Sequence, residues 1–586
     1  MSALAGMPSD AGAKLNSQAI LLADEPRAEL RKLEQTWAEA GNVRRLWRKD
    51  STLWTGGEEG KWLDWLGIVD AELERIGELE AFAAEVREGN FRDVLLLGMG
   101  GSSLGPEVLA NGLGSAAGFP RVHVLDSTDP QQIRTLEALV DLERTLFIVS
   151  SKSGTTLEPN IFFEYFWARA AAALGTREPG DRFIAVTDPG SHLQKVAEQK
   201  NFRRIFPGVP GIGGRYSVLS NFGMVPLAAS GRSVRVFLEH ARDMARACGA
   251  EAAPAQNPGV QLGLALGLLA RHGRDKVTII ASASLGGFGA WAEQLLAEST
   301  GKNGTGLIPV DLEPLGEPAV YGLDRVFIYL EDTRRPDAAQ ARAIETLEGS
   351  GQPIVRIGVP GPELLGQEFF RWEIATAVAG AVIGIDPFDQ PDVEASKVAT
   401  RELTDAYERQ GSVPAERAVF SENGIALFTD EDNARALKAG GAGNSLESWL
   451  AAHLARLDQG DYFALLAYLE RNLQHTEASQ RLRIAVRDRR RVATCLGFGP
   501  RFLHSTGQAY KGGPNSGVFL QVTCKDALDL EIPGRKATFG VVKDAQARGD
   551  FRVLAERRRR VLRAHLAEDV SAGLAALDRA AERALS

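Results

Sequence analysis

Two apolar strands that each run straight into a loop of glycines and hydroxyls limit what this chain can fold into. The first strand is expected over residues 94–97 with its loop over 98–103, and the second over 146–149 with its loop over 150–156. Glycines let a backbone approach an anion closely, and hydroxyls and the free amides of a following helix donate hydrogen bonds to it. Two such loops at the ends of parallel strands predict a phosphate held from both sides.

Short runs of Val, Ile, Leu and Phe alternate with helical patterns around these loops. One set lies between about residues 90 and 230 and a second between about 255 and 400. Continuous apolar runs separated by helices are typical of a parallel sheet covered on both faces. We therefore predict an α/β protein with two doubly wound parallel-sheet lobes. Their strands are expected over 94–97, 122–125, 146–149, 183–186, 277–281, 326–330 and 354–359.

The 586 residues are too many for a single core, so the chain is expected to divide into several units. We predict an N-terminal helical segment over 1–88, a first lobe over 89–235, a second lobe over 236–410 and a smaller C-terminal α/β unit over 411–586. In the last unit, strands are expected near 418–421, 425–428, 492–496 and 518–522, and helices near 431–439, 445–489 (interrupted) and 550–567. Its arginine clusters, 487–491 and 557–560, are interpreted as solvated helix faces.

Composition narrows the partners and the compartment. A net charge of -9 argues against nucleic acid or an anionic membrane as the main partner. The three cysteines lie far apart and form no CxxC pair, so neither a disulfide framework nor a metal site is expected, and the compartment is predicted to be reducing. No leader pattern and no apolar run of about 20 residues is visible, so a cytoplasmic location is the expectation.

The first loop also resembles a dinucleotide fingerprint. Gly98-x-Gly100-x-x-Ser103 has serine in place of the third glycine, and Asp126 ends the next expected strand, where a ribose-binding acid could lie. Taken alone, this pattern weakly favours NAD. The second hydroxyl-rich loop argues against that interpretation, because a dinucleotide needs only one pyrophosphate loop.

Two further segments contain residue types that turns alone do not require. Arg215 follows two glycines in the segment 213–217, where its guanidinium could face an oxyanion, although a lone arginine is more often a salt-bridge partner. Glu298 lies where an amphipathic helix over 291–300 ends in a glycine loop. A carboxylate at that position is a candidate base.

Together these segments resemble the glucose-6-phosphate isomerase family, whose two lobes are sugar-isomerase (SIS) domains. The resemblance spans roughly residues 90–400 in the family's order, and as a set it is highly specific. The rest of the chain resembles the long form that occurs fused behind a transaldolase, although no transaldolase barrel precedes residue 90. The matching segments are 98–102, 151–156, 213–217, 296–302 and 386–397.

The resemblance implies a role for individual residues. Glu298 corresponds to the base that moves a proton between C1 and C2 of the sugar, and Arg215 to the cation beside the developing enediolate. Gln390 and Lys397 match the family's glutamine and lysine near the ring oxygen, and Glu158 matches another active-site position. The residues expected to hold the substrate phosphate are Gly101, Ser102, Ser151, Lys152, Ser153, Thr155 and Thr156.

One family feature is missing from this sequence. The family opens the sugar ring with a histidine about twenty residues after the catalytic glutamate, contributed across a dimer, but residues 310–325 contain none. Our hypothesis is that the C-terminal unit reaches the sugar site, in its own or a neighbouring subunit, and that His504 or Lys511 replaces the missing group. A satisfied loop histidine is an equally good interpretation of His504.

The resemblance therefore implies an isomerase that interconverts glucose 6-phosphate and fructose 6-phosphate through a cis-enediol(ate). A positioned base and a fixed cation suffice for that reaction, so no metal or redox cofactor is expected. The expected partner is a hexose 6-phosphate, and the expected assembly is a homodimer. Three alternatives stay open: an isomerase that also accepts mannose 6-phosphate, a sugar-phosphate-binding regulator without catalysis, and one half of a transaldolase–isomerase pair.

Overall fold

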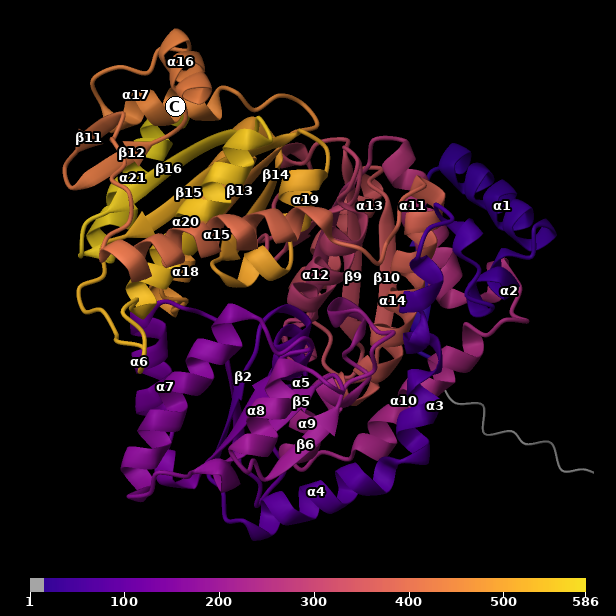
Figure 1. Cartoon of the computed structure of the whole chain (residues 1–586). Helices are drawn as coiled ribbons and strands as arrows, with labels where there is room; N and C mark the ends of the chain where they lie inside the picture. Colours follow the sequence, from indigo (N-terminus) through magenta and orange to yellow (C-terminus); the bar gives the residue numbers. More distant parts are fainter. Residues whose placement is uncertain (1–14) are drawn as a thin grey trace, which may run out of the picture.

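The computed structural model describes residues 15–586 and confirms the predicted α/β fold with two lobes built on parallel sheets (Figure 1). The first lobe, drawn in purple, has five parallel strands in the order β3-β2-β4-β5-β6. The central strands β2, β4 and β5 are buried along their whole length, which explains their continuous apolar runs. The elements are β2 (Asp93–Leu97), α5 (Leu104–Leu113), β3 (Arg121–Leu125), α6 (Pro130–Leu139), β4 (Thr145–Ser150), α7 (Leu157–Leu174), β5 (Phe183–Thr187), α8 (His192–Gln199), β6 (Arg204–Pro207) and α9 (Asn221–Ala229).

The second lobe has a five-stranded sheet in the order β1-β10-β9-β7-β8. Four strands are parallel, and β1 (Ser17–Leu21) joins the edge antiparallel to β10. The N-terminal segment, expected to be helical, therefore also supplies a strand that covers an open sheet edge. The remaining elements are α10 (Val234–Ala247), α11 (Pro258–Arg271), β7 (Lys276–Ala281), α12 (Phe288–Thr300), β8 (Ile308–Asp311), β9 (Arg325–Asp332), α13 (Ala338–Gly349), β10 (Ile354–Val359), α14 (Leu365–Ile383) and α15 (Pro391–Gln410).

One hydrophobic core continues from the N-terminal helices through both lobes. Leu30, Ile148 and Ile328, which come from a helix and from both sheets, all belong to it. Because the lobes share buried side chains, the positions of their loops relative to each other are set by packing. None of the helices described between residues 15 and 586 is long and apolar enough to cross a membrane. The N-terminal helices are α1 (Asp24–Glu39), α2 (Asn42–Trp47), α3 (Ile68–Glu74) and α4 (Ile76–Glu88).

The C-terminal unit has its own six-stranded sheet and its own core (Figure 1, orange and yellow). Two sequence-based assignments are wrong there. The interrupted helix expected over 445–489 contains a strand, and the helix expected over 550–567 ends at residue 556 and is followed by another strand. The elements are β11 (Phe420–Glu422), β12 (Ile425–Phe428), α16 (Glu431–Ala439), α17 (Leu446–Leu454), β13 (Tyr462–Tyr468), α18 (Leu473–Arg490), β14 (Ala493–Phe498), α19 (Gly507–Gly512), β15 (Gly517–Cys524), α20 (Phe539–Glu556), β16 (Arg560–Leu566) and α21 (Val570–Leu585).

The two arginine clusters of this unit are not simply solvated helix faces, as the sequence suggested. Arg487 is 3% exposed and forms an ion pair with Asp488. Arg559 is 5% exposed and donates to the carbonyl oxygen of Gly513 at 2.8 Å. These guanidiniums satisfy backbone and carboxylate oxygens inside the fold, and that need keeps them buried.

The loop after β3, residues 126–129, binds the C-terminal unit to the first lobe. Asp126 forms an ion pair with Arg501 at 2.8 Å, and Asp129 forms one with Lys543 at 2.8 Å. Asp126 is therefore a structural partner of an arginine and not a ribose-binding acid. From the other side, α15 lies against α20 (Figure 1). The C-terminal unit thus contacts the first lobe through the loop after β3 and the second lobe through α15.

Two acids meet where the second lobe faces the C-terminal unit. The Asp311 amide donates to Glu293 Oε1 at 3.1 Å. Burial raises the pKa of Asp311 to about 7, against the opposing charge of Arg483. Burial and the charge of Asp311 raise the pKa of Glu293 well above its usual value. The folded protein therefore keeps protons on these two carboxyl groups at a pH at which the unfolded chain would release them.

Asp311→Asn is expected to raise the melting temperature more at pH 8 than at pH 5. A carboxyl whose folded pKa is raised stabilises the fold below its unfolded pKa, and that contribution is lost as the pH rises through about 7. The gain over wild type should be roughly 2 to 4 °C at pH 8, measured by scanning calorimetry across this range. The matched control is Asp405→Asn on the exposed face of α15; a gain independent of pH would contradict the prediction.

Candidate active site

The two loops marked by the sequence follow β2 and β4, which are neighbours in the first sheet. The first loop forms the 3₁₀ turn η4 (Gly100–Ser102), whose residues are all buried. The second leads into α7, with Thr156 at the N-cap. Because parallel strands end at the same edge of a sheet, both loops border one region, as the sequence predicts.

Hydroxyl groups of the second loop bind one another and the loop backbone. Ser151 Oγ accepts a hydrogen bond from the Gly154 amide at 3.2 Å and donates to Thr156 Oγ1 at 3.3 Å. Ser153 Oγ lies 2.9 Å from Thr155 Oγ1. The first amides of a helix have no acceptor within it, and the helix dipole favours an anion there. The loop therefore has the donors that phosphate oxygens require.

Lys152, which the resemblance assigns to the phosphate, lies beside a carboxylate of the neighbouring strand end. Its ammonium forms an ion pair with Asp188 and donates to the carbonyl oxygen of Pro210 at 3.1 Å. Asp188 directly follows β5, the strand beside β4, and so lies at the same sheet edge within reach of the lysine. The lysine therefore pairs with this carboxylate here, and its role as a phosphate ligand stays a prediction.

Glu298 and Arg215 form an ion pair, with 3.3 Å between Oε1 and Nη1. Glu298 lies in the last turn of α12 and is 9% exposed, whereas Arg215 lies in the 3₁₀ turn η7 (Gly214–Tyr216) and is 2% exposed. A charge pair so far out of water interacts strongly. The structure thus places the candidate base beside the candidate cation, in an environment from which water is mostly excluded.

Four further acceptors orient Arg215. Its Nε donates to Ser299 Oγ at 2.8 Å and its Nη1 to Gln390 Oε1 at 2.9 Å. Its Nη2 donates to the carbonyl oxygens of Pro387 at 2.8 Å and Asp389 at 2.9 Å. Gln390 therefore contributes to the site through the guanidinium. With nearly every donor engaged, the plane of Arg215 is fixed before any ligand arrives.

The turn that carries Arg215 and the first loop approach each other closely. A β carbon on Gly101 would lie 1.9 Å from the Gly214 carbonyl oxygen, so only glycine allows this contact. Gln294 Nε2 donates both to Glu298 Oε2 at 2.9 Å and to the His504 carbonyl oxygen at 2.8 Å. Gln294 is absent from the sequence-based expectations, although its position four residues before Glu298 places both on one helix face.

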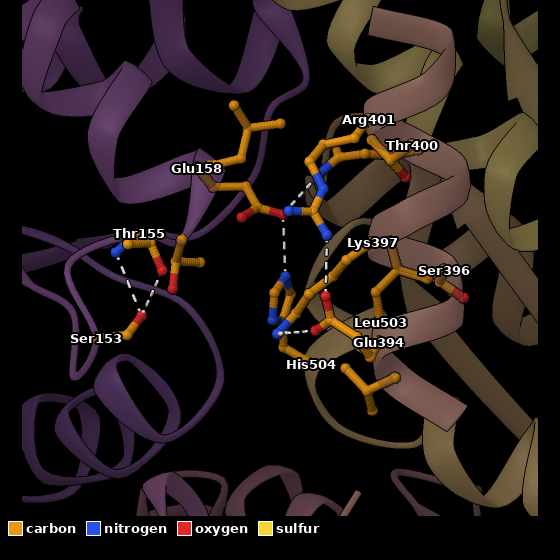
Figure 2. Close-up of a pocket in the computed structure, with 14 residues that line it drawn as sticks. Ser153, Thr155, Glu158, Glu394, Ser396, Lys397, Thr400, Arg401, Leu503 and His504 are labelled. Carbon is orange, nitrogen blue, oxygen red and sulfur yellow. Dashed lines mark hydrogen bonds and ion pairs between the residues drawn. The ribbon is translucent and has the colours of Figure 1, made fainter. Parts of the chain in front are cut away.

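His504 lies in the same pocket as the second loop. Its Nε2 is 2.9 Å from Glu158 Oε1, and the two side chains face each other from different units in Figure 2. Gln546 Nε2 also donates to Glu158 Oε1, at 2.6 Å. Burial acts to raise the pKa of Glu158, but the charge and hydrogen bond of His504, together with the charge of Lys397, hold it below the usual value. Glu158 is therefore an ionised carboxylate facing the imidazole.

The opposite wall of this pocket is α15. Lys397 lies there with its ammonium 3.7 Å from a carboxylate oxygen of Glu394, and its side chain is half exposed. Lys511, the other suggested replacement for the missing histidine, lies elsewhere: it is 3% exposed and pairs with Asp550 at 2.6 Å. The structure therefore brings His504, and not Lys511, to the pocket.

Another lysine, close to Arg215, has a lowered pKa. Lys302 is 3% exposed and pairs with Asp389 at 2.7 Å. Burial and the nearby charge of Arg215 lower its pKa to about 8, although Asp389 opposes the shift. This lysine is part of a matching segment, but no role was expected for it. Its contacts make it a support for the loop that carries Gln390.

Comparison with known proteins agrees with this geometry. The family model described as phosphoglucose isomerase matches residues 75–307, which include both strand-end loops, Arg215 and Glu298. A glucose-6-phosphate isomerase of Rubrobacter xylanophilus is 31% identical over 365 residues, covering 54% of this chain and 84% of that protein. A probable glucose-6-phosphate isomerase of Methanococcus maripaludis is 27% identical over 373 residues, covering 58% of this chain and 83% of that one.

Solved structures support the same fold. A hypothetical protein of Thermus thermophilus aligns with a TM-score of 0.56 and 24% identity, over 66% of this chain and 99% of that one. The alignment covers nearly all of that protein, whereas about a third of this chain lies outside it. The sequence relatives likewise cover little more than half of this chain.

Proposed function

Since this chain belongs to the phosphoglucose isomerase family, it interconverts glucose 6-phosphate and fructose 6-phosphate, and we propose which of its residues carry each step. The Glu298–Arg215 pair is the observation on which the proposal depends. It joins a carboxylate, able to take a proton from carbon, to a cation able to face the oxygen on which charge then develops. The turn of Arg215 contacts the loop at the end of β2 through Gly214 and Gly101.

In the proposed isomerisation, Glu298 removes the proton on C2 of open-chain glucose 6-phosphate and returns it to C1. The electron pair of the C–H bond forms the C1–C2 double bond of the enediolate, and the negative charge collects on O1, the oxygen of the former carbonyl. O1 then takes up a proton and the O2 hydroxyl gives one up, so that the return of the proton to C1 leaves the carbonyl at C2. Arg215 stabilises that charge, and a fixed donor acts more strongly on the transition state than on the ground state. Gln294 holds the unpaired side of the Glu298 carboxylate at 2.9 Å.

The phosphate is proposed to bind at the N-terminus of α7 and at the η4 turn. Binding energy from this remote group orients the reacting carbons. The hydroxyls of Ser151, Ser153 and Thr155, the amides of the first turn of α7 and the buried Ser102 are the donors we assign to it. Lys152, which pairs with Asp188, stays a further candidate for binding the phosphate.

Ring opening is proposed to use His504 from the same chain. A proton passes from the imidazolium to the ring oxygen as the C1–O5 bond breaks, and the C1 hydroxyl releases its proton to solvent, which leaves an aldehyde. The ionised Glu158 holds Nε2–H at 2.9 Å, so Nδ1 is the nitrogen left for the sugar. Lys397, across the pocket, adds positive charge near the ring oxygen.

His504→Asn is expected to slow turnover of cyclic glucose 6-phosphate roughly 10²-fold, because acid–base help of this kind contributes at least that much. The kinetic isotope effect of deuterium at C2 should fall toward one, since ring opening then limits the rate. A coupled assay with labelled and unlabelled substrate measures both quantities.

The matched control is His475→Asn, a buried histidine of the same unit whose Nδ1 lies 2.9 Å from the Glu470 carbonyl oxygen. It should leave rate and isotope effect unchanged. Full activity of His504→Asn with an unaltered isotope effect would return His504 to a structural role.

One assay tests the activity itself: fructose 6-phosphate with glucose-6-phosphate dehydrogenase, followed by NADPH absorbance. An inactive wild-type enzyme would refute the isomerase assignment. The same assay with mannose 6-phosphate as substrate tests the dual activity, which stays an alternative, as does work beside a separate transaldolase. The homodimer, the cytoplasmic location and the division into four units also stay predictions.

A further inference from the structure

We propose that Gln546, from α20 of the C-terminal unit, is a positioning residue that holds Glu158 and thereby orients the imidazole of His504. The inference depends on the proposed role of His504 in ring opening. It assigns to the C-terminal unit a second side chain at the site, and it explains why this unit is attached to the first lobe at the loop after β3.

The amide of Gln546 has a defined orientation. Its Nε2 donates to Glu158 Oε1 at 2.6 Å, and its Oε1 accepts from Thr128 Oγ1 at 2.7 Å. Gln546 is 2% exposed and Thr128 is fully buried. Rotating the amide by half a turn would place its oxygen against the Glu158 carboxylate, where two acceptors repel each other. The glutamine can therefore serve this carboxylate in one orientation only.

One carboxylate oxygen collects both donors. Glu158 Oε1 accepts from Gln546 Nε2 and from His504 Nε2, so the glutamine and the imidazole lie on either side of the same atom. Glu158 itself is 4% exposed in the first turn of α7. A buried carboxylate with a single donor can rotate toward other partners, whereas one with two donors is held in place.

Thr128 is itself held between two ion pairs. Asp126, two residues before it, pairs with Arg501, which begins the turn that ends at His504. Asp129, the next residue, pairs with Lys543, three residues before Gln546 on α20. Through these ion pairs, the loop after β3 fixes the two segments of the C-terminal unit that contact Glu158, which are the turn over 501–504 and α20.

Losing the Gln546 donor should also change the acid side of the pH profile of kcat/KM. Burial favours the neutral form of Glu158, whereas the charge and hydrogen bond of His504 favour the ionised form. The Gln546 donor acts in the same direction as His504, because a hydrogen bond to a carboxylate favours its ionised form. Without the glutamine, Glu158 takes up a proton at a higher pH, and a neutral Glu158 no longer orients His504 as an acceptor. The charged and titratable groups that face Glu158 or its pocket are His504, Lys397, Glu394, Arg401 and Tyr468.

The test compares Gln546→Leu with wild type on glucose 6-phosphate. We expect kcat/KM to fall roughly 10- to 100-fold, as for loss of a hydrogen bond to a charged group. The C2 deuterium isotope effect should fall toward one, and the acid limb of the profile should move to higher pH. Thr128→Val should change all three in the same direction but less, and Thr128→Ser, which keeps the hydroxyl, should restore wild-type values.

Gln521→Leu is the matched control. Gln521 is a fully buried glutamine of the same unit that donates to the Ala547 carbonyl oxygen of α20 at 3.0 Å, away from Glu158. It should affect stability and leave the isotope effect and the pH profile unchanged. If Gln521→Leu shifted both of them as Gln546→Leu does, a general disturbance of α20 would explain the result and the inference would be overturned.

The failure of this inference and that of the proposed function give different results. If His504→Asn keeps full activity, the ring-opening role fails whatever Gln546 does. If His504→Asn slows ring opening while Gln546→Leu and Thr128→Val match wild type, only the positioning role fails. In the double variant His504→Asn/Gln546→Leu, the second change should add almost nothing, because both act through one group. Fully additive losses would contradict the proposal.

Discussion

Glu298→Gln is expected to lower kcat by ~10² to 10⁴, the usual contribution of a positioned general base. Glutamine keeps the shape of the side chain, and its oxygen can still accept from Arg215, whose Nη1 lies 3.3 Å from Glu298 Oε1. Its NH2 group takes the place of Oε2, to which Gln294 Nε2 donates at 2.9 Å, so that one hydrogen bond is lost. Glutamine also loses the ability to take a proton from carbon. Substrate binding should therefore change little, and the loss should lie in kcat.

Exchange of the C2 hydrogen with solvent, followed by NMR in D₂O, measures this step directly and should slow as much as turnover does. Glu293→Gln is the matched control on the same helix. The pKa of Glu293 is raised well above its usual value, so glutamine imitates its neutral form there. Similar kcat values for wild type and Glu298→Gln would move the base to another residue.

Arg215→Lys is expected to lower kcat by about 10²- to 10³-fold, as for removal of one preorganised donor to an oxyanion. Lysine keeps a positive charge but lacks the planar fork that engages Ser299, Gln390 and two backbone carbonyl oxygens at 2.8–2.9 Å. A mobile ammonium can pair with Glu298 but cannot hold a fixed place beside the enediolate.

Steady-state kinetics and a melting curve separate the two consequences of this change. Arg325→Lys is the matched control: Arg325 is fully buried in the second lobe and pairs with Glu313 at 3.0 Å, outside the site. It should lower the melting temperature while leaving kcat of the folded enzyme unchanged. If Arg215→Lys behaved in the same way, its guanidinium would have only a structural function.

The parallel sheets were predictable from the sequence because their central strands are buried on both faces. β2 and β4 read as continuous apolar runs for that reason. β13 is equally apolar and entirely buried, but its run joined a helical pattern on either side and periodicity alone did not separate them. β16 contains Arg560 and Arg563, whose carboxylate partners come from distant segments, so its local pattern resembles a charged helix.

The site, too, has parts that the sequence predicts and parts that it does not. Arg215 and Glu298 belong to compact segments that match the family's motifs, so the resemblance implied a role at the sugar for both. The ion pair of Lys152 was not predictable, because its partner, Asp188, lies 36 residues away and nothing local marks it. Gln546 and Glu158 are 388 residues apart. No spacing rule reaches across such a distance, so contacts of this kind become visible only in the folded chain.

The attachment of His504 to the same polypeptide as Glu158 has a consequence for dilute enzyme. Two groups on separate subunits meet only as often as the subunits associate, whereas groups joined by one chain meet at an effective concentration set by the fold. Asp126 and Asp129 secure this proximity through ion pairs of 2.8 Å. A lone copy of this chain therefore has within itself all the groups assigned here to the reaction, however few other copies surround it.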